Sequence, residues 1–288
     1  MKVVNDVGLP GPIMKAIERH DYDPGESDKT VTTLIGPPLI PYLIKKHGDE
    51  VEENASGRLF SLMGRMMHKV FEVAGEDEEL GHLILEKRLY TTVDGCKVGG
   101  QIDVIDPDAG IITDYKVCSY WTAIYGAKIE WEQQQNIYRL LARDNGYDIN
   151  RLQIAAMYRD WSAEKADRDP SYPSTQMQVI ELPVWDYSRT EKYLSERIKV
   201  HSNPNPPICT PEERWERDTK YAIEKDGRKS ALKLCDSAAE ASMWMANNVK
   251  PHEMGKVRVV KRLGESKRCK RYCPVAKFCE HGRKVLAN

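Results

Sequence analysis

The stretch GGQIDVIDPDAGIITDYK, residues 99–116, decides the fold of this chain. The segments 98–106 and 111–118 both have the composition and alternation of half-buried strands. Residues 107–110, Pro-Asp-Ala-Gly, form a four-residue turn between them. The stretch therefore predicts a β-hairpin.

The turn also sets the register of this hairpin. Counting back from the loop, Asp103 falls opposite Asp114 and Gln101 falls opposite Lys116. Directly opposed residues share one face, with Cβ atoms about 5 Å apart. We therefore expect both carboxylates and the lysine amine to point into one cleft, while a mostly apolar set packs on the other face.

Two facing carboxylates repel each other unless a positive charge lies between them. A divalent cation, Mg²⁺ or Mn²⁺, fits this role, and so does the neighbouring ammonium of Lys116. Such a cation polarises a phosphodiester oxygen and lowers the pKa of a bound water, and Lys116 would orient the attacking water or neutralise charge on phosphorus. The residues alone fit equally well with a surface hairpin that carries a solvated ion pair.

Four short motifs in this chain resemble those of the PD-(D/E)XK nuclease superfamily, in its RecB-like branch. Residues 100–103 match the G-x-x-D element, and residues 114–116 match the D-x-K element. The branch also carries a histidine on an upstream helix, here His68, and a Q-x-x-x-Y element after the hairpin, here residues 134–138. All four occur in the family's order, and the resemblance extends from about residue 39 to the C-terminus.

The resemblance implies an α/β fold with a restriction-endonuclease-like core, in which helices flank a mixed central sheet. It also implies that His68, Asp103 and Asp114 are metal ligands, together with the backbone carbonyl of Tyr115. Lys116 would be the catalytic lysine. An imidazole ligand in an oxygen-rich site favours Mn²⁺ over Mg²⁺.

The pattern of apolar residues predicts the two helices that carry the remaining motifs. Residues 58–74 form a strongly apolar helix that includes His68, and a glycine one turn earlier suggests a close approach to that helix. On the helix after the hairpin, Gln134 and Tyr138 lie on one face, and a buried amide there needs a polar partner. We assign both to substrate positioning, with an ordinary core stripe as the alternative. Glu86, on a strand before the hairpin, is a weaker candidate metal ligand.

Seven cysteines without a secretory or membrane-spanning segment indicate a reducing cytosol, where clustered thiols bind metals more often than they form disulfides. Cys269, Cys273 and Cys279 have the spacing C-x3-C-x5-C, and Cys209 is our candidate for a fourth ligand, with Cys235 next. The set resembles the four cysteines that hold a [4Fe-4S] cluster in iron–sulfur nucleases of the AddB type and of CRISPR adaptation. The first cysteine follows the core rather than preceding it, and one spacing differs, which leaves Zn²⁺ as an alternative.

A basic segment surrounds these cysteines. Residues 256–284 contain eleven Lys or Arg against two Glu in a chain whose net charge is −1. Such a segment attracts a phosphate backbone, although a solvated helix surface is the usual reason for a run of charge. The candidate DNA contacts are Arg159, Trp161, Arg268, Lys270 and Arg271.

We divide the chain into three parts: an N-terminal arm at 1–35, a nuclease core at 36–208, and a C-terminal Cys-rich, metal-bound subdomain at 209–288. The last part contains a small inserted αβ module at about 215–262. With 41% hydrophobic and 30% charged residues and no long apolar run, the sequence indicates a cytoplasmic protein, bacterial or in a phage-infected host, without a membrane association.

The sequence therefore predicts a metal-dependent DNA exonuclease that hydrolyses phosphodiester bonds in recombination, repair or phage DNA metabolism. Its partners would be DNA and either a second copy of the chain or a recombination or adaptation protein. Three alternatives remain: a CRISPR prespacer-processing nuclease, an inactive DNA-binding scaffold of nuclease descent, and a zinc-binding interaction module.

Overall fold

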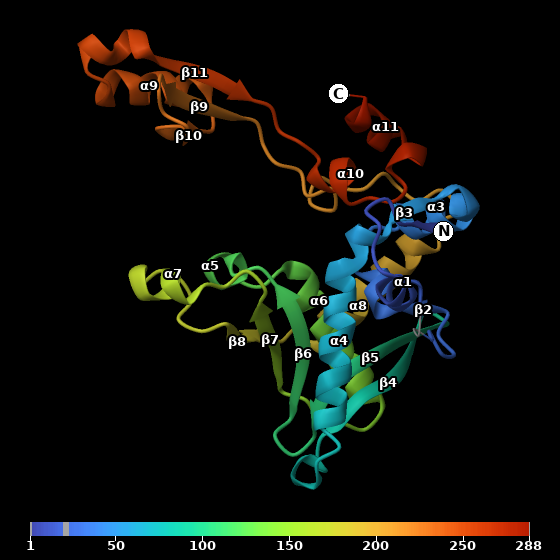
Figure 1. Ribbon diagram of the computed structural model, residues 1–288. Helices are drawn as coiled ribbons and strands as arrows, with labels where there is room; N and C mark the ends of the chain where they lie inside the picture. Colours follow the sequence, from blue (N-terminus) through green and yellow to red (C-terminus); the bar gives the residue numbers. More distant parts are fainter. Residues whose placement is uncertain (1, 20–22, 288) are drawn as a thin grey trace. The chain divides into compact units, whose positions relative to one another are not determined.

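The computed structural model describes residues 2–19 and 23–287 (Figure 1). The chain divides into two compact units, Met1–Pro207 and Ile208–Asn288, which are described separately below.

The first unit is built around a six-stranded mixed sheet. The strand order is β2-β5-β6-β7-β8, and β4 pairs with β5 on its other edge. The β4–β5, β5–β6 and β7–β8 pairs are antiparallel, whereas β2–β5 and β6–β7 are parallel. The strands are β2 (Lys29–Thr30), β4 (Ile84–Val93), β5 (Cys96–Asp106), β6 (Ile111–Cys118), β7 (Arg151–Tyr158) and β8 (Met177–Leu182). A separate parallel pair joins β1 (Lys2–Val4) and β3 (Glu52–Asn54).

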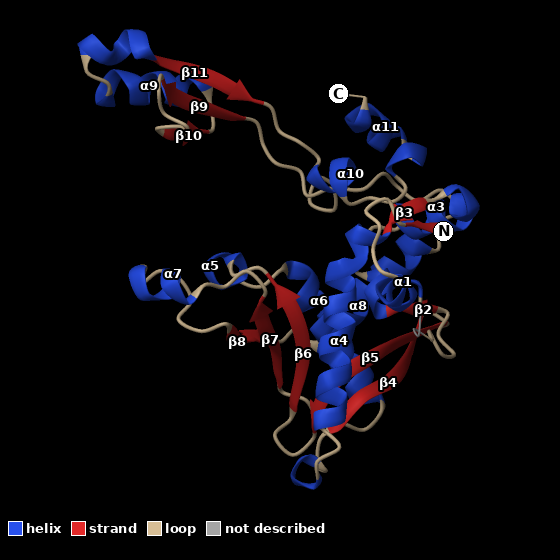
Figure 2. Ribbon diagram, in the orientation of Figure 1, coloured by secondary structure: helices blue, strands red, loops and turns tan. Residues whose placement is uncertain are grey.

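Helices flank this sheet. α4 contacts β6 and crosses one face, while α6 contacts β4, β5, β6 and β7, and α8 packs beside α6 (Figure 2). This arrangement confirms a mixed central sheet flanked by helices. The helices of the unit are α1 (Gly11–Glu18), α2 (Val31–Leu34), α3 (Leu39–His47), α4 (Leu59–Ala74), α5 (Trp121–Tyr125), α6 (Ile129–Asp144), α7 (Ala163–Arg168) and α8 (Tyr187–His201).

The core of the unit lies between the sheet and α6. Ile105 and Ile112 on the hairpin and Ile154 on β7 are fully buried in one cluster with Ile137 and Leu141 of α6. Burying side chains of this size stabilises the fold by about 1.5–3 kcal/mol each. This packing fixes which face of the hairpin turns toward α6.

The predicted hairpin forms, with the predicted turn. The carboxylate of Asp106 accepts a hydrogen bond from the backbone N–H of Ala109 at 2.8 Å, and Gly110 adopts a φ of +66°, a region that favours glycine. Asp106 pairs with Ile111, as predicted, but the ladder continues only as far as Val104, opposite Thr113. The expected pairs of residue 103 with 114 and of residue 101 with 116 are not formed as ladder pairs.

Strand β5 explains why the ladder stops. β4 pairs with β5 along most of its length, so its other edge is shared between two strands. β2 pairs there with Val98 and Gly99, and β6 pairs there with residues 104–106. Between them, residues 100–103 have no strand partner on this edge within the described chain. The strands diverge at this gap, and the sheet opens into a cavity.

The N-terminal segment is not an arm, which corrects the predicted boundary at residue 35. Ile17, Val31 and Leu34 are fully buried, and β2 contributes a strand to the central sheet. The guanidinium of Arg65 on α4 also donates to the backbone carbonyls of Ala16 and Arg19. The segment is too short and too irregular to show its burial as a periodic pattern. Residues 1 and 20–22 of the predicted arm lie outside the described residues.

The second unit contains a three-stranded antiparallel sheet in the order β10-β9-β11, with α9 packed on it. Its apolar cluster contains Ile223, Cys235, Ala241 and Val257. The elements are β9 (Lys220–Lys225), β10 (Lys233–Cys235), α9 (Ala238–Asn248) and β11 (Val257–Arg262), followed by α10 (Lys267–Arg271) and α11 (Glu280–Leu286). Across the described part of the chain, the helices all fall short of the length and apolarity that a membrane span requires.

Candidate metal centre and active site

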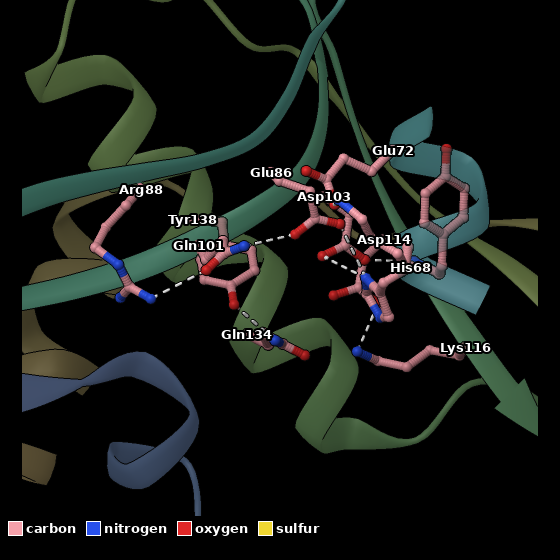
Figure 3. Close-up of polar contacts among 12 residues, drawn as sticks. His68, Glu72, Glu86, Arg88, Gln101, Asp103, Asp114, Lys116, Gln134 and Tyr138 are labelled. Carbon is pink, nitrogen blue, oxygen red and sulfur yellow. Dashed lines mark hydrogen bonds and ion pairs between the residues drawn. The ribbon is translucent and has the colours of Figure 1, made fainter. Parts of the chain in front are cut away.

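A cavity of about 700 Å³ opens at the gap in the edge of β5. Side chains reach it from both helices and from the strands: His68 from α4, Glu86 from β4, Asp103 from β5, Asp114 and Lys116 from β6, and Gln134 from α6. The predicted site residues of the core thus gather in one place (Figure 3).

Three of these side chains are arranged to hold a cation. One ligand atom each from His68, Glu86 and Asp103 lies within 4.8 Å of the other two. The Nδ1 atom of His68 is 3.1 Å from Glu86 Oε1 and 3.5 Å from Asp103 Oδ1. The hydrogen bond with Glu86 is the main reason why the pKa of His68 is raised.

Glu86 takes a larger part in this group than its sequence context suggests. It has a φ of +48° at the third residue of β4, a backbone conformation that costs a non-glycine residue on the order of 1–2 kcal/mol. Its neighbours Leu85 and Lys87 pair with Val104 and Ile102, so Glu86 lies directly across from the Asp103 position. The strained backbone brings its carboxylate to the cluster.

A chain of hydrogen bonds holds this carboxylate in place (Figure 3). Gln101 Nε2 donates to Glu86 Oε2 at 2.7 Å, and Gln101 Oε1 accepts from Arg88 at 3.1 Å. Side chains that orient a metal ligand in this way fix its geometry and its affinity.

Asp103 is buried at the centre of the group. Its Oδ2 accepts a hydrogen bond from the backbone N–H of Tyr115 at 2.8 Å, and its Oδ1 faces His68. Burial, and next the charge of Asp114, raise the pKa of Asp103 to about 7. Ionisation of this buried carboxylate is therefore unfavourable unless a cation neutralises its charge.

Asp114 and Lys116 are adjacent, as the D-x-K spacing predicts. Asp114 is 1% exposed, and its Oδ2 lies 2.5 Å from Lys116 Nζ without any hydrogen bond of acceptable geometry. A buried carboxylate oxygen of this kind calls for a further positive partner. Together with the triad, the donor set of imidazole and carboxylates fits a divalent cation.

Gln134 and Tyr138 also border the cavity, and their side chains contact each other. Gln134 Nε2 donates to the Tyr138 hydroxyl at 2.9 Å. A Cβ at Gly100 would lie 2.5 Å from the Tyr138 ring, which explains the glycine of the G-x-x-D element. The expected close approach at Gly64 is not found: a Cβ there would meet no atom of the described chain within 4 Å.

The four predicted cysteine ligands all lie in the second unit, and their binding of a metal stays a prediction. Burial raises the pKa of Cys209 to about 12, and Glu213, Cys273, Cys279 and Cys269 add to the rise through their charges. Cys235 is instead buried in the apolar cluster of the β9–β11 sheet. This placement favours Cys209 as the fourth ligand. No three of the four sulfur atoms lie within 4.8 Å of one another among the described residues.

The side chains that we expect to contact DNA differ in the contacts that they already make within the protein. The Arg159 guanidinium covers the exposed Phe60 ring at 4.4 Å, and Trp161 donates its indole N–H to the carbonyl of Pro173 and packs against the core. Arg268 donates to the Glu213 carbonyl, and Lys270 lies 3.8 Å from Glu265. Their contact with DNA, and that of Arg271, stays a prediction.

Sequence reasoning missed two parts of the cavity wall. Thr30 and Arg19 line it from the N-terminal segment, which we expected outside the core. Arg65 also lines it, and this residue could have been found because it stands one helical turn before His68.

The chain was also compared with known proteins. No protein-family model matches it, and no curated protein matches it. Among solved structures it is similar to SSO0001, with 16% identity, a TM-score of 0.47, and coverage of 70% of this chain and 88% of that one. It is also similar to a Eubacterium rectale protein described as "Putative exonuclease", with 16% identity, a TM-score of 0.26, and coverage of 61% of this chain and 65% of that one.

Proposed function

We propose that this protein is a divalent-metal-dependent DNA exonuclease. The observation that supports the proposal is that ligand atoms of His68, Glu86 and Asp103 lie within 4.8 Å of one another. Asp114 and Lys116 line the same cavity, with the Lys116 amine 2.5 Å from the Asp114 carboxylate. Buried acids with a neighbouring amine, at the floor of an open cavity, suit hydrolysis of an anionic phosphodiester.

His68, Glu86, Asp103 and Asp114 would hold the ion, and the carbonyl of Tyr115 would complete the set. When bound, Mg²⁺ or Mn²⁺ supplies Lewis-acid activation of the phosphodiester and a lowered pKa for water. Asp114 holds Lys116 in place, and the ammonium of Lys116 orients water and offsets negative charge on the phosphate.

Gln134 and Tyr138 would position the substrate. Their mutual hydrogen bond fixes the Tyr138 ring against Gly100 and leaves the Gln134 carbonyl oxygen as an acceptor beside the cavity. The basic residues Arg268, Lys270 and Arg271 of the second unit would add sequence-independent attraction to DNA.

The four cysteines would bind a [4Fe-4S] cluster in preference to Zn²⁺. Four thiolates on one zinc ion lie about 3.8 Å apart, since Zn–S bonds are about 2.3 Å long and tetrahedral. Among the described residues, no three of these sulfur atoms lie within 4.8 Å of one another. A cluster that binds each thiolate through a separate iron suits the wider spacing.

End-labelled DNA with Mn²⁺ or Mg²⁺ tests the nuclease proposal. Wild-type protein should release labelled nucleotides from linear DNA and leave closed circular DNA intact, whereas Asp114→Ala and Lys116→Ala should not degrade either. Asp108→Ala, at the exposed hairpin turn, is the matched control and should retain activity. Equal degradation by all four proteins would contradict the assignment, and cleavage of circles would replace the exonuclease with an endonuclease.

A further inference from the structure

An aromatic platform lies just beyond the end of β6. We use this name for Tyr172, Tyr120, Trp121 and Tyr125, whose rings follow one another in this order. The centroids of Tyr172 and Tyr120 are 4.6 Å apart, those of Tyr120 and Trp121 are 4.7 Å apart, and those of Trp121 and Tyr125 are 5.5 Å apart. The last pair is nearly parallel, at 14°.

The platform runs from the interior of the unit to solvent. Tyr172 is buried, and its hydroxyl accepts a hydrogen bond from the Ser162 backbone, which anchors the inner end. Trp121 is 47% exposed and Tyr125 is 79% exposed. Large aromatic rings are seldom left in water without a function, so the outer end is a candidate contact surface.

A cavity of about 650 Å³ borders the rings of Tyr172, Tyr120 and Trp121. The ammonium of Lys165 lies 5.5 Å from the Tyr120 ring centroid and 5.8 Å from that of Tyr172, and no ion pair joins it to a carboxylate in the described chain. The other charges of the wall are engaged: Arg168 pairs with Glu164, and Asp169 accepts hydrogen bonds from Ser171. Lys165 is therefore the cation that an incoming phosphate would meet.

The platform continues the strand that carries the proposed active site. Tyr120 follows Lys116 by four residues, which an extended chain spans in about 13 Å. The backbone N–H of Tyr120 donates to Asp160 at 2.8 Å, and Asp160 also accepts from Ser119, so the exit from β6 is held in place. A nucleic-acid strand bound at Asp114 would have to cover about this distance to reach the rings.

We propose that the aromatic platform binds single-stranded DNA by stacking its bases, with Lys165 contacting a backbone phosphate. This inference rests on the proposed nuclease function for its choice of DNA as the ligand. Rings that stack on one another can continue the stack only with bases that are free of a duplex. A protein partner is the competing occupant, but stacked rings beside an ammonium favour a base and its phosphate.

Binding of an oligonucleotide tests this proposal without requiring hydrolysis. All proteins carry Lys116→Ala to prevent cleavage, and fluorescence anisotropy measures the affinity for labelled dT12 and for an abasic strand of equal length. Trp121→Ala with Tyr125→Ala should weaken binding of dT12 by between about fivefold and hundredfold, and binding of the abasic strand far less. Trp121→Phe with Tyr125→Phe should restore the affinity for dT12.

Val179→Ala serves as the control, because Val179 is a similarly exposed apolar side chain of the same unit. Unchanged affinity for dT12 in the double alanine variant would overturn the proposal and leave the surface to a protein partner. An equal loss for both strands would overturn it as well, since stacking would not contribute. Cleavage by the protein with Lys116 intact is scored separately: ring-dependent binding without any cleavage would reject the nuclease function alone.

Discussion

The Oδ2 atom of Asp103 accepts a hydrogen bond from the backbone N–H of Tyr115 at 2.8 Å. In a regular sheet, the backbone of a neighbouring strand would accept this hydrogen bond. Tyr115 would otherwise have to find a partner on β5, whose pairing with β6 ends at Val104. The same contact that ends the ladder holds the acid at the cavity, between His68 and Asp114. Local backbone structure and the proposed chemistry thus depend on one side chain.

The stability of the metal-free protein should fall as the pH rises from about 4 to about 8. The pKa of Asp103 is raised to about 7, so its contribution is complete below pH 3.8 and is lost as the pH rises through 7. The raised pKa of His68 acts in the same direction. Thermal unfolding across this range measures this fall, and Asp103→Asn should flatten the profile; an unchanged profile would contradict the buried acid.

Metal affinity should follow the opposite trend. Binding requires the ionised Asp103, so the affinity for Mn²⁺ should rise with pH and level off above about 7. Calorimetric titration at several pH values gives this curve together with the protons released. A pH-independent affinity would mean that Asp103 is not a ligand.

Asp103→Asn and Asp114→Asn should separate stability from function. Each change removes one of two repelling buried carboxylates, and each should abolish nuclease activity. The metal-free Asp103→Asn protein should unfold at a higher temperature, whereas Asp114→Asn also breaks the ion pair with Lys116 and should not. Asp108→Asn at the exposed turn should change neither property. If both substitutions at the site lowered the unfolding temperature, protein groups would already be stabilising the charges of the two carboxylates without a metal.

Glycine at position 86 should be more stable than alanine, which reverses the usual order for a residue inside a strand. The φ of +48° at Glu86 costs alanine about 1 kcal/mol more than glycine. Both variants lose the carboxylate, so metal binding should fall equally in both. Chemical denaturation of Glu86→Gly and Glu86→Ala compares their free energies of unfolding. A more stable alanine variant would contradict the positive φ at position 86.

Gly100→Ala should reduce both stability and activity. The new Cβ would lie 2.5 Å from the Tyr138 ring and 3.0 Å from Val31, so the ring must move and its hydrogen bond to Gln134 weakens. We expect a loss of about 1–3 kcal/mol. Gly64→Ala is the matched control: it meets open space in α4 and should stabilise the protein by about 1 kcal/mol. Denaturation and nuclease assays on both variants check this contrast.

Replacing one clustered cysteine should remove the metal from the second unit. Cys273→Ser should lose bound iron and the brown absorbance of a [4Fe-4S] cluster after anaerobic purification, because it removes one of the four proposed ligands. Cys235→Ser, at a buried thiol outside the set, should retain the metal. Metal analysis distinguishes the outcomes, and a colourless wild-type protein with one zinc ion would reject the iron–sulfur proposal.

The sequence by itself determined the hairpin, its turn and its register as far as Val104, because Asp106, Gly110 and the alternating apolar residues are local signals. It also placed His68 on its helix and named Asp103, Asp114 and Lys116, since two-residue spacing on a strand keeps side chains on one face. These inferences use contacts between residues that are close in the chain.

Only the tertiary structure decided how the cavity opens. On the edge of β5 that β2 and β6 share, residues 100–103 have no strand partner in the described chain, and β2, from the segment expected to be an arm, pairs with the adjacent part of that edge. No local pattern records such a long-range pairing. The strained backbone of Glu86 likewise depends on how separate segments pack. Interactions between residues close in the chain specify the strands and helices. Packing between distant segments across the sheet specifies which polar side chains are buried in the same place.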